Sequence, residues 1–337
     1  MLNVLILGAN GFVGTHLSLV LKKNKKINLI LGCRNPSKLL DELKGEKLRV
    51  GDLQDKQYLS TLFNDIDVLV NLASWASLFG EKESSKKLFL NPTIDIINKA
   101  KIAGVKKYIS LSSTSIADVK EAQDANSNGR FRSLWPHFNN LVKIENHLRQ
   151  SANDNFNVIN LRCGLFTGKY YALGLLPILL PRLKTQLVPL VQGGNTQMPL
   201  TDGSDIAQAF VLAILSKQKF NNYECFNILG KNVPKVKDVL MYLHEKHHYP
   251  YPHFSVPFFI AYPFAHLMEI LNPIMPFEPL IVRSIVHLLE DTNTDNNKAK
   301  ELLFYEPKKE WRESIDEQVK EINEKQNPSM KMNKDKE

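Results

Sequence analysis

The sequence predicts an α/β protein, built on a doubly wound parallel sheet with a smaller C-terminal α+β region. Two observations support this prediction. Apolar, strand-like runs alternate with helical patterns through the first half of the chain, and this rhythm breaks after residue 165. Because the apolar runs are continuous, both faces of each strand are expected to lie beneath helices, as in βαβ units.

The expected elements of the first half alternate along the chain. The strands are at residues 3–8, 27–33, 47–52, 67–73, 107–113 and 156–162. The helices are at 12–23, from Pro36 onward, at about 84–104 and at 135–148. The last helix is predicted to be amphipathic, because its apolar residues recur at helical spacing: Phe138, Leu141, Val142 and Leu148.

The second half is expected to mix short strands with helices. The strands are at 187–193 and 225–230, and the helices at about 203–217, 234–248 and 310–325, with others rich in proline and aromatic residues up to about 290. We expect residues 1–165 to form the sheet domain, with 187–230 returning to it, and 166–325 to form mainly the second region. Residues 326–337 are expected to be a disordered polar tail, and the polar loop 118–132 a mobile flap.

The composition is that of a soluble globular protein, with 43% hydrophobic and 23% charged residues among 337. The net charge of +8 is spread along the chain with no basic, aromatic-rich run, so nucleic acid is not an expected partner. The excess of positive charge favours an anionic ligand or a membrane surface.

The cysteines and the N-terminus indicate the compartment. The chain has three cysteines far apart in sequence, Cys33, Cys163 and Cys225, which argues against a disulfide framework. Glycines begin at Gly8, which is too early for an export signal. We therefore expect a cytoplasmic location.

Residues 254–277 are the most apolar part of the chain. A membrane-spanning helix needs roughly 20 apolar residues with few charges. This stretch contains four prolines, His266 and Glu269, so it is not expected to span a membrane. Core helices or a lid over a substrate are expected instead, and a peripheral membrane contact through 254–277 is the alternative.

The strongest motif is L-I-L-G-A-N-G-F-V-G, in which Gly8, Gly11 and Gly14 lie between the first strand and the first helix. Glycine permits the tight turn and the close approach of the backbone to a pyrophosphate, and the helix N-terminus favours an anion. Because the motif opens a βαβ series, it predicts a Rossmann-type dinucleotide-binding domain.

The end of the second strand indicates which dinucleotide is bound. An acidic residue there would bind the ribose hydroxyls of NAD, but no acidic residue occurs between Thr15 and Leu40. Arg34 is placed to meet a 2′-phosphate, and Lys38 is expected to assist. The sequence therefore favours NADP as the cofactor, with NAD as the second choice.

With these residues in hand, the chain resembles the extended short-chain dehydrogenases/reductases, also called the NAD-dependent epimerase/dehydratase family. Six segments are similar to the family's motifs: G-A-N-G-F-V-G at 8–14, G-D-L-Q-D at 51–55, N-L-A-S at 71–74, S-L-S-S at 110–113, L-R-C-G-L-F-T-G at 161–168 and T-D-G-S-D-I-A-Q-A-F at 201–210. The C-terminal third looks most like the 3β-hydroxysteroid dehydrogenase and dihydroflavonol reductase branch. That likeness implies a substrate-binding role for 166–325.

The resemblance implies a set of cofactor-binding residues. They are Gly8, Asn10, Gly11, Phe12, Val13, Gly14, Asp52, Leu53, Leu72, Ala73, Ser74 and Lys143, in addition to Arg34. It also implies that Ser113 polarises a substrate carbonyl. Cys163 stands where the family usually has a proline after the arginine.

The family places a tyrosine four residues before its catalytic lysine, and this chain departs from that pattern. Lys143 matches the lysine, and the tyrosine position is Asn139. An amide has no proton to exchange near neutral pH, so Asn139 cannot act as a general acid or base. The expected catalytic set is therefore Ser113, Lys143 and Asn139, with Asn139 as a hydrogen-bonding group.

Three functions stay open at this point. The leading one is an NADP-dependent reductase or dehydrogenase of a hydrophobic or amphipathic carbonyl or alcohol, with a proton from water, His137, Tyr170 or Tyr171. A nucleotide-sugar epimerase or dehydratase is the second, with diphosphate ligands to be sought at Arg182, Lys184 and Arg283. The third is a non-catalytic NAD(P)-binding regulatory or structural protein. A small-molecule substrate is expected in the first two, and a homodimer is compatible with all three.

No metal site is expected. H-E-K-H-H at 244–248 fits the zinc-protease pattern H-E-x-x-H, but it ends a helix with an apolar stripe, and no third ligand is evident.

Overall fold

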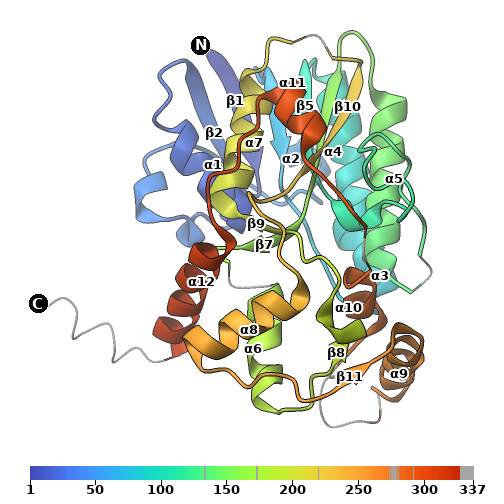
Figure 1. Cartoon of the computed structure of the whole chain (residues 1–337). Coiled ribbons are helices and arrows are strands. Elements are labelled where there is room, and N and C mark those ends of the chain that lie inside the picture. Colours follow the sequence, from blue (N-terminus) through green and yellow to red (C-terminus); the bar gives the residue numbers. More distant parts are fainter. Residues whose placement is uncertain are drawn as a thin grey trace, which may run out of the picture.

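A computed structural model describes residues 1–132, 134–171, 174–218, 220–272, 274, 279, 281–290 and 292–326. Its centre is a seven-stranded, entirely parallel sheet in the order β10-β6-β5-β4-β1-β2-β3 (Figure 1). The strands are β1 (Leu2–Leu7), β2 (Ile27–Cys33), β3 (Lys47–Val50), β4 (Val68–Asn71), β5 (Lys107–Ser113), β6 (Asn157–Cys163) and β10 (Tyr223–Ile228). The α/β fold class predicted from the sequence is confirmed.

Helices cover both faces of this sheet. Successive side chains of each strand point to opposite faces, and because both sets are apolar, both faces must be buried. Val4 and Ile6 of β1 belong to a core shared with α1 (Phe12–Leu21), α7 (Gly203–Leu215) and α11 (Asn297–Leu303). Leu5 and Leu7 belong to a core shared with α2 (Lys56–Thr61), α4 (Asn91–Ile102) and α5 (Pro136–Ser151). The sheet is thus doubly wound.

Two of the expected helices take a different form. The helix predicted from Pro36 is only two single 3-10 turns, η1 (Pro36–Lys38) and η2 (Asp41–Leu43). The Asn35 side chain accepts a hydrogen bond from Ser37 N–H, which favours a short turn over a continuing helix. The helix predicted at 84–104 is α3 (Lys82–Ser85), a π-helical turn η3 (Lys86–Leu90) and then α4.

The C-terminal region lies below the sheet in Figure 1. Its core unites α6 (Leu175–Lys184), α8 (Val236–His247) and α12 (Trp311–Gln326), and a smaller core joins α9 (Phe258–Leu271) to Val286 of α10 (Arg283–Leu288). Two short parallel pairs connect these elements, β7 (Leu165–Thr167) with β9 (Leu200–Asp202) and β8 (Leu190–Val191) with β11 (Ser255–Val256). The strand expected at 187–193 is therefore only two residues long. Of the tail expected at 326–337, Gln326 is the last residue of α12, and residues 327–337 lie outside the described residues.

The loop 118–132, expected from its composition to be a mobile flap, is hydrogen-bonded to strands at the edge of the sheet. Asn227 of β10 donates a hydrogen bond to the Ala122 carbonyl (2.9 Å), and Arg162 of β6 donates one to the Ser127 carbonyl (2.7 Å). The Asn126 side chain donates to Glu224 (2.7 Å). Two backbone carbonyls and one side chain of this loop thus satisfy polar groups of buried strands, which composition alone does not reveal.

The three cysteines are buried and unpaired in the structure. Within the described ranges, none of the helices combines the length and the apolar character that a membrane crossing requires. The cytoplasmic location stays a prediction.

Candidate functional site

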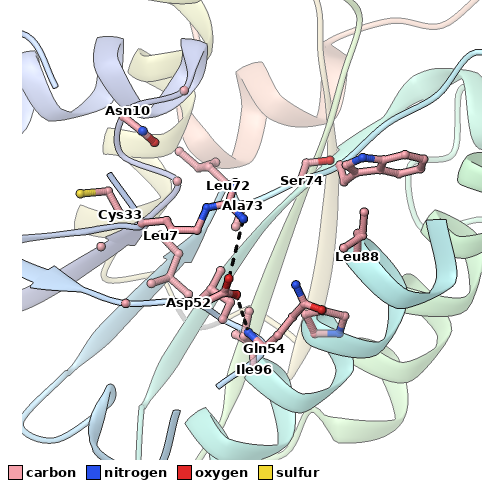
Figure 2. Close-up of a pocket in the computed structure, with 18 of the residues that line it drawn as sticks. Leu7, Asn10, Cys33, Asp52, Gln54, Leu72, Ala73, Ser74, Leu88 and Ile96 are labelled. Atoms are coloured by element: carbon pink, nitrogen blue, oxygen red, sulfur yellow. Dashed lines mark hydrogen bonds and ion pairs between the residues drawn. The ribbon is translucent and has the colours of Figure 1, made fainter. Parts of the chain in front are cut away.

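A cavity of about 520 Å³ opens where β1, β2 and β4 end, which is the usual place for a ligand in a doubly wound sheet. We call it the glycine-turn cavity (Figure 2). It is lined by Leu7, Gly8, Asn10, Gly11, Gly32, Cys33, Arg34, Asn35, Lys38, Gly51, Asp52, Leu53, Gln54, Tyr58, Leu72, Ala73, Ser74, Trp75, Leu88, Phe89, Pro92, Thr93 and Ile96. Backbone from three strand ends and side chains from α4 thus enclose one space.

The glycine turn is held by close packing that only glycine allows. Gly8 has a φ of +76°, and a Cβ there would lie 2.9 Å from the backbone of Leu72 and Ala73. A Cβ at Gly14 would lie 2.2 Å from the Gly8 carbonyl oxygen. Gly11 begins α1 without a side-chain cap, so no side chain occupies the N–H groups of the first helical turn. This cradle fits the pyrophosphate of a dinucleotide.

Charged groups meet at the end of β2 and after β3. The Arg34 guanidinium lies 3.7 Å from the Asp52 carboxylate, and both side chains are exposed. Asp52 also accepts a hydrogen bond from the Gln54 backbone N–H (2.9 Å), which fixes its position on the cavity wall (Figure 2). Lys38 lines the same cavity. Two cations are therefore available to an anionic group of a ligand beside β2.

Most of the residues expected to bind the cofactor line the glycine-turn cavity. They are Gly8, Asn10, Gly11, Arg34, Asp52, Leu53, Leu72, Ala73 and Ser74. Phe12, Val13 and Gly14 are not in its lining. Phe12 packs against Tyr171 with ring centroids 4.5 Å apart, and Val13 is buried in the core. These two residues and Gly14 pack against the glycine turn on the side away from the cavity.

Lys143 does not reach this cavity. Its side chain is exposed and lines a separate surface depression, the α4–α5 hollow, together with Leu90, Asn91, Ile94, Asp95, Asn146, His147 and Gln150. The two spaces lie on different sides of α4, because Pro92, Thr93 and Ile96 line the glycine-turn cavity. The expectation that Lys143 holds the cofactor ribose is therefore corrected: in this structure it belongs to another face.

Asn139 lies one turn before Lys143 and has a structural contact of its own. Its side-chain oxygen accepts a hydrogen bond of 2.6 Å from the backbone N–H of Arg132. The amide thus holds the end of the 118–132 loop against the start of α5. A single sequence cannot reveal this contact, because it depends on how the loop returns to the helix.

The inward side of α5 has a different pair four residues apart, His137 and Leu141. Both are buried. The His137 ring lies 4.9 Å from that of Phe89, which lines the glycine-turn cavity. Burial lowers the pKa of His137 to about 4, opposed by a hydrogen bond with the Trp75 backbone. These two inward positions therefore contain neither the tyrosine nor the lysine that is typical of the family.

Ser113 ends β5 and is half-buried. Its hydroxyl oxygen accepts a hydrogen bond from Ser115 N–H and so caps a 3-10 turn, η4 (Thr114–Ile116). The Ser115 carbonyl lies 3.1 Å from Nε2 of His287, whose Nδ1 lies 3.2 Å from Glu290. This brings α10 to the end of β5.

Glu290 also pairs with Arg132 at 3.1 Å, and both side chains are largely buried. A polar chain thus runs from Asn139 through Arg132, Glu290 and His287 to the turn beside Ser113. Sequence reasoning did not find His287 or Glu290, because no local pattern connects residues that are about 170 positions from β5.

Neither Tyr170 nor Tyr171 is placed as an acid at the glycine-turn cavity, whose lining includes neither residue. Tyr171 packs on Phe12 and Phe166, and burial raises its pKa to about 12. The Tyr170 ring lies against His16, and its backbone N–H donates to Glu321. Their role in the described structure is to join α1 to the C-terminal region.

Two of the motifs that resemble the family's, at 161–168 and 201–210, contribute polar side chains that make structural contacts. Glu145 and Arg162 form a buried ion pair (2.6 Å) between α5 and β6. Asp202 caps α7 through Ser204 N–H (2.8 Å), and Asp205 accepts hydrogen bonds from the backbone of Lys308 and Lys309. The first contact ties α5 to the sheet, and the Asp205 contacts tie α7 to the C-terminal segment.

The histidines of H-E-K-H-H have protein partners. His244 Nδ1 lies 2.8 Å from the Tyr249 carbonyl, and His247 Nε2 lies 2.7 Å from Asp316. Among the described residues, no group of three or more metal-ligand side chains gathers at one point.

Several lining residues of the glycine-turn cavity were not expected. Gln54 lies inside the G-D-L-Q-D motif, and Trp75 follows the N-L-A-S motif by one residue, so a fuller use of those two motifs would have found them. Leu88, Phe89, Pro92, Thr93 and Ile96 come from η3 and α4 and have no sequence signature. Only the packing of α4 over the strand ends brings them there.

Comparison with known proteins agrees with this architecture. The sequence model of the NAD dependent epimerase/dehydratase family matches residues 4–228. A curated relative, 3beta-hydroxysteroid-dehydrogenase/decarboxylase isoform 2 of Arabidopsis thaliana, is 25% identical over 334 residues, with 90% of this chain covered. The match spans 58% of that relative's own length.

Solved structures share the fold over nearly the whole chain. UDP-glucuronic acid 4-epimerase from Bacillus cereus in complex with NAD has a TM-score of 0.70 and 17% identity, and covers 96% of this chain and 97% of its own. UDP-glucose 4-epimerase from Thermotoga maritima with UDP-glucose has a TM-score of 0.69 and 17% identity (97% and 100% covered). A short-chain dehydrogenase/reductase superfamily protein from Agrobacterium tumefaciens with bound NAD has a TM-score of 0.70 and 14% identity (98% and 99% covered).

Proposed function

Because this chain belongs to the NAD-dependent epimerase/dehydratase family, we propose that it binds NADP in the glycine-turn cavity and is an oxidoreductase of a small hydrophobic or amphipathic molecule. The observation that carries the proposal is the cavity itself. A glycine turn, an uncapped helix N-terminus and two cations line one space at the end of β1 and β2. The backbone cradle would hold the pyrophosphate.

The preference for NADP rests on the groups beside β2. Arg34 and Lys38 line the cavity, and the residue that would bind ribose hydroxyls in an NAD site is replaced by Arg34 at the end of this strand. Arg34 is held beside Asp52 at 3.7 Å, in an exposed pair that contributes little by itself. A 2′-phosphate would offer the guanidinium a stronger, bidentate partner than this carboxylate does.

For the chemistry we propose reduction of a carbonyl or oxidation of an alcohol, in which the bound nicotinamide supplies or accepts a hydride. Ser113 would hold the substrate oxygen. No phenol stands on the inward side of α5, where His137 and Leu141 lie, so this chain has no counterpart of the family's usual proton donor there. A general acid typically contributes 10²- to 10⁴-fold in rate, so slow turnover is expected.

The proposed substrate class rests on the apolar C-terminal region and on the curated relative named as a hydroxysteroid dehydrogenase/decarboxylase. The nucleotide-sugar alternative needs free cations for a diphosphate. Arg283 is bonded to Glu269 (2.7 Å), and Arg182 to the Ile178 and Pro279 carbonyls. These contacts weaken the nucleotide-sugar alternative. The second candidate is a non-catalytic NADP-binding protein, because the Tyr–Lys pair is absent from the inward side of α5.

One series of measurements tests both candidates. NADPH and NADH are titrated by fluorescence, and NADPH absorbance is then followed with hydrophobic ketones and with UDP-sugars. Oxidation of NADPH by a hydrophobic ketone supports the oxidoreductase. Tight NADPH binding without turnover on any compound favours the non-catalytic protein. Failure to bind either dinucleotide would reject the site itself.

A further inference from the structure

Helix α9 presents an apolar surface that no described part of the chain covers. We call it the α9 face. It consists of Phe259, Ile260, Phe264, Leu267, Ile270 and Leu271, whose side chains are between 38% and 74% exposed. Phe254 and Ile274, on either side of the helix, are exposed as well. Single exposed apolar residues are ordinary, but a cluster of this size on one helix marks an interaction surface.

The opposite side of α9 is apolar too. Ala261 and Ala265 pack against Val191 of β8 and Val286 of α10. Glu269 is the one charged residue between Phe258 and Leu271, and it is nearly buried. It forms hydrogen bonds of 2.7, 2.9 and 2.7 Å with Arg283. A helix that is apolar on all sides normally lies in a protein core or in a membrane.

The chemistry of the α9 face indicates what kind of partner fits it. Specific protein interfaces contain about one hydrogen bond per 100–200 Å² and a polar rim that fixes the register. Apart from His266, the exposed side chains of α9 contain no hydrogen-bonding group. Figure 1 shows α9 at the periphery of the molecule, beyond α10 and away from the central sheet. A protruding helix without directional groups suits a fluid apolar phase better than a second copy of the chain.

Charge favours the same partner. β11 pairs with β8, and this places the segment before β8 next to the residues that lead into α9. That segment contains the exposed Leu187. Lys184, the last residue of α6, comes just before the segment, is exposed, and has its ammonium 5.6 Å from the centre of the Tyr249 ring. The chain as a whole has a net charge of +8. Anionic lipid surfaces attract basic proteins, which then bury apolar side chains among the acyl chains.

We propose that the α9 face docks on the surface of an anionic phospholipid bilayer. The helix has 14 residues, too few to cross the hydrocarbon layer, and it lies along the surface with Phe259, Phe264 and Leu267 in the acyl region. Lys184 remains at the headgroup level. The β8–β11 pair and α10 hold the helix from the protein side.

Vesicle flotation with the full chain tests this. Phosphatidylcholine vesicles and mixed phosphatidylcholine–phosphatidylserine vesicles are compared. The wild type is expected to float with both, and more strongly with the mixed vesicles. Phe259→Asp combined with Leu267→Asp should weaken partitioning by at least about tenfold, since two apolar anchors are lost and two like charges are added. Ile102→Asp, at an exposed position on α4, should float like the wild type.

Sedimentation without vesicles gives the competing outcome. If the α9 face joins two copies of the chain, the wild type is a dimer that the double variant converts to a monomer, and vesicle binding is absent. That result would overturn the proposal, and so would equal flotation of the wild type and the double variant. Circular dichroism and NADPH titration of the double variant show whether the fold is intact. If it is not, the single variant Phe259→Asp, at the most exposed position of the face, takes its place.

Discussion

The side-chain oxygen of Asn139 lies 2.6 Å from the backbone nitrogen of Arg132 and accepts its hydrogen bond. This contact ties the loop before α5 to the helix, and Arg132 continues it to Glu290 of the C-terminal region. The residue at the position matched to the family's tyrosine therefore has a structural function.

Asn139→Ala should lower the free energy of unfolding by about 1 kcal/mol, because one half-buried hydrogen bond to the backbone is lost. Affinity for NADPH should not change. Asn146→Ala, on the exposed side of the same helix, is the matched control and should leave stability unchanged. Urea denaturation measures the difference. Unchanged stability together with lost turnover would instead make the amide catalytic.

Lys143→Met should leave NADPH affinity within about twofold of the wild type, because the side chain lines the α4–α5 hollow and not the glycine-turn cavity. The measurement is a fluorescence titration. A loss of more than about tenfold would mean that Lys143 reaches the cofactor after all. For the same geometric reason, Asn139→Tyr should not raise ketone reduction.

Gly11→Val should weaken NADPH binding by more than about tenfold, since a branched side chain would enter the place of the pyrophosphate. The fold should tolerate the change, because a Cβ there approaches only the Gly8 carbonyl, at 3.2 Å. Gly45→Val is the matched control, with nothing within 4 Å of its Cβ. Equal affinity in the two variants would remove the phosphate-cradle assignment.

Arg34→Asp should weaken NADPH by about tenfold or more and NADH much less, because it replaces a cation beside the 2′-phosphate with an anion. Asp52→Asn should instead strengthen NADPH binding, since it removes the carboxylate that competes for Arg34 at 3.7 Å. Lys25→Asp makes a similar charge change at an exposed position away from the cavity. If NADH and NADPH respond equally to Arg34→Asp, the arginine does not select the cofactor.

The stability of the protein should depend on His137 in mildly acidic solution. Its pKa falls from 6.5 to about 4 in the folded state, because burial disfavours the charged ring. Below pH 6.5 the unfolded chain therefore binds a proton that the folded chain does not. The free energy of unfolding should fall as the pH drops from 6.5 to about 4, by ~3 kcal/mol in total.

His137→Phe should remove this part of the pH dependence, whereas His253→Gln, at an exposed position, should keep it. Denaturation curves at about pH 7 and about pH 4.5 provide the comparison. A His137→Phe variant with the wild-type pH profile would show that another group is responsible.

Local patterns determined the sheet and the phosphate cradle. Continuous apolar strands alternate with helices because both faces of a parallel sheet must be buried, and this pattern is written in neighbouring residues. Gly8 and Gly14 are predictable for the same reason, since a turn between a strand and a helix is local. Arg34 and Asp52 follow strand ends, so the topology of such sheets already places them near the cradle.

Position around a helix axis could not be read from one sequence. Lys143 and Asn139 matched a spacing, but spacing gives a shared face without saying which face looks inward. The packing of α5 on α4 decides that, and it turns His137 and Leu141 inward and Lys143 outward. Contacts between distant segments, such as Asn139 with Arg132 and His287 with Ser115, depend on loop paths and on the C-terminal helices. Only the tertiary structure determines these, because their energies arise between residues that no local rule connects.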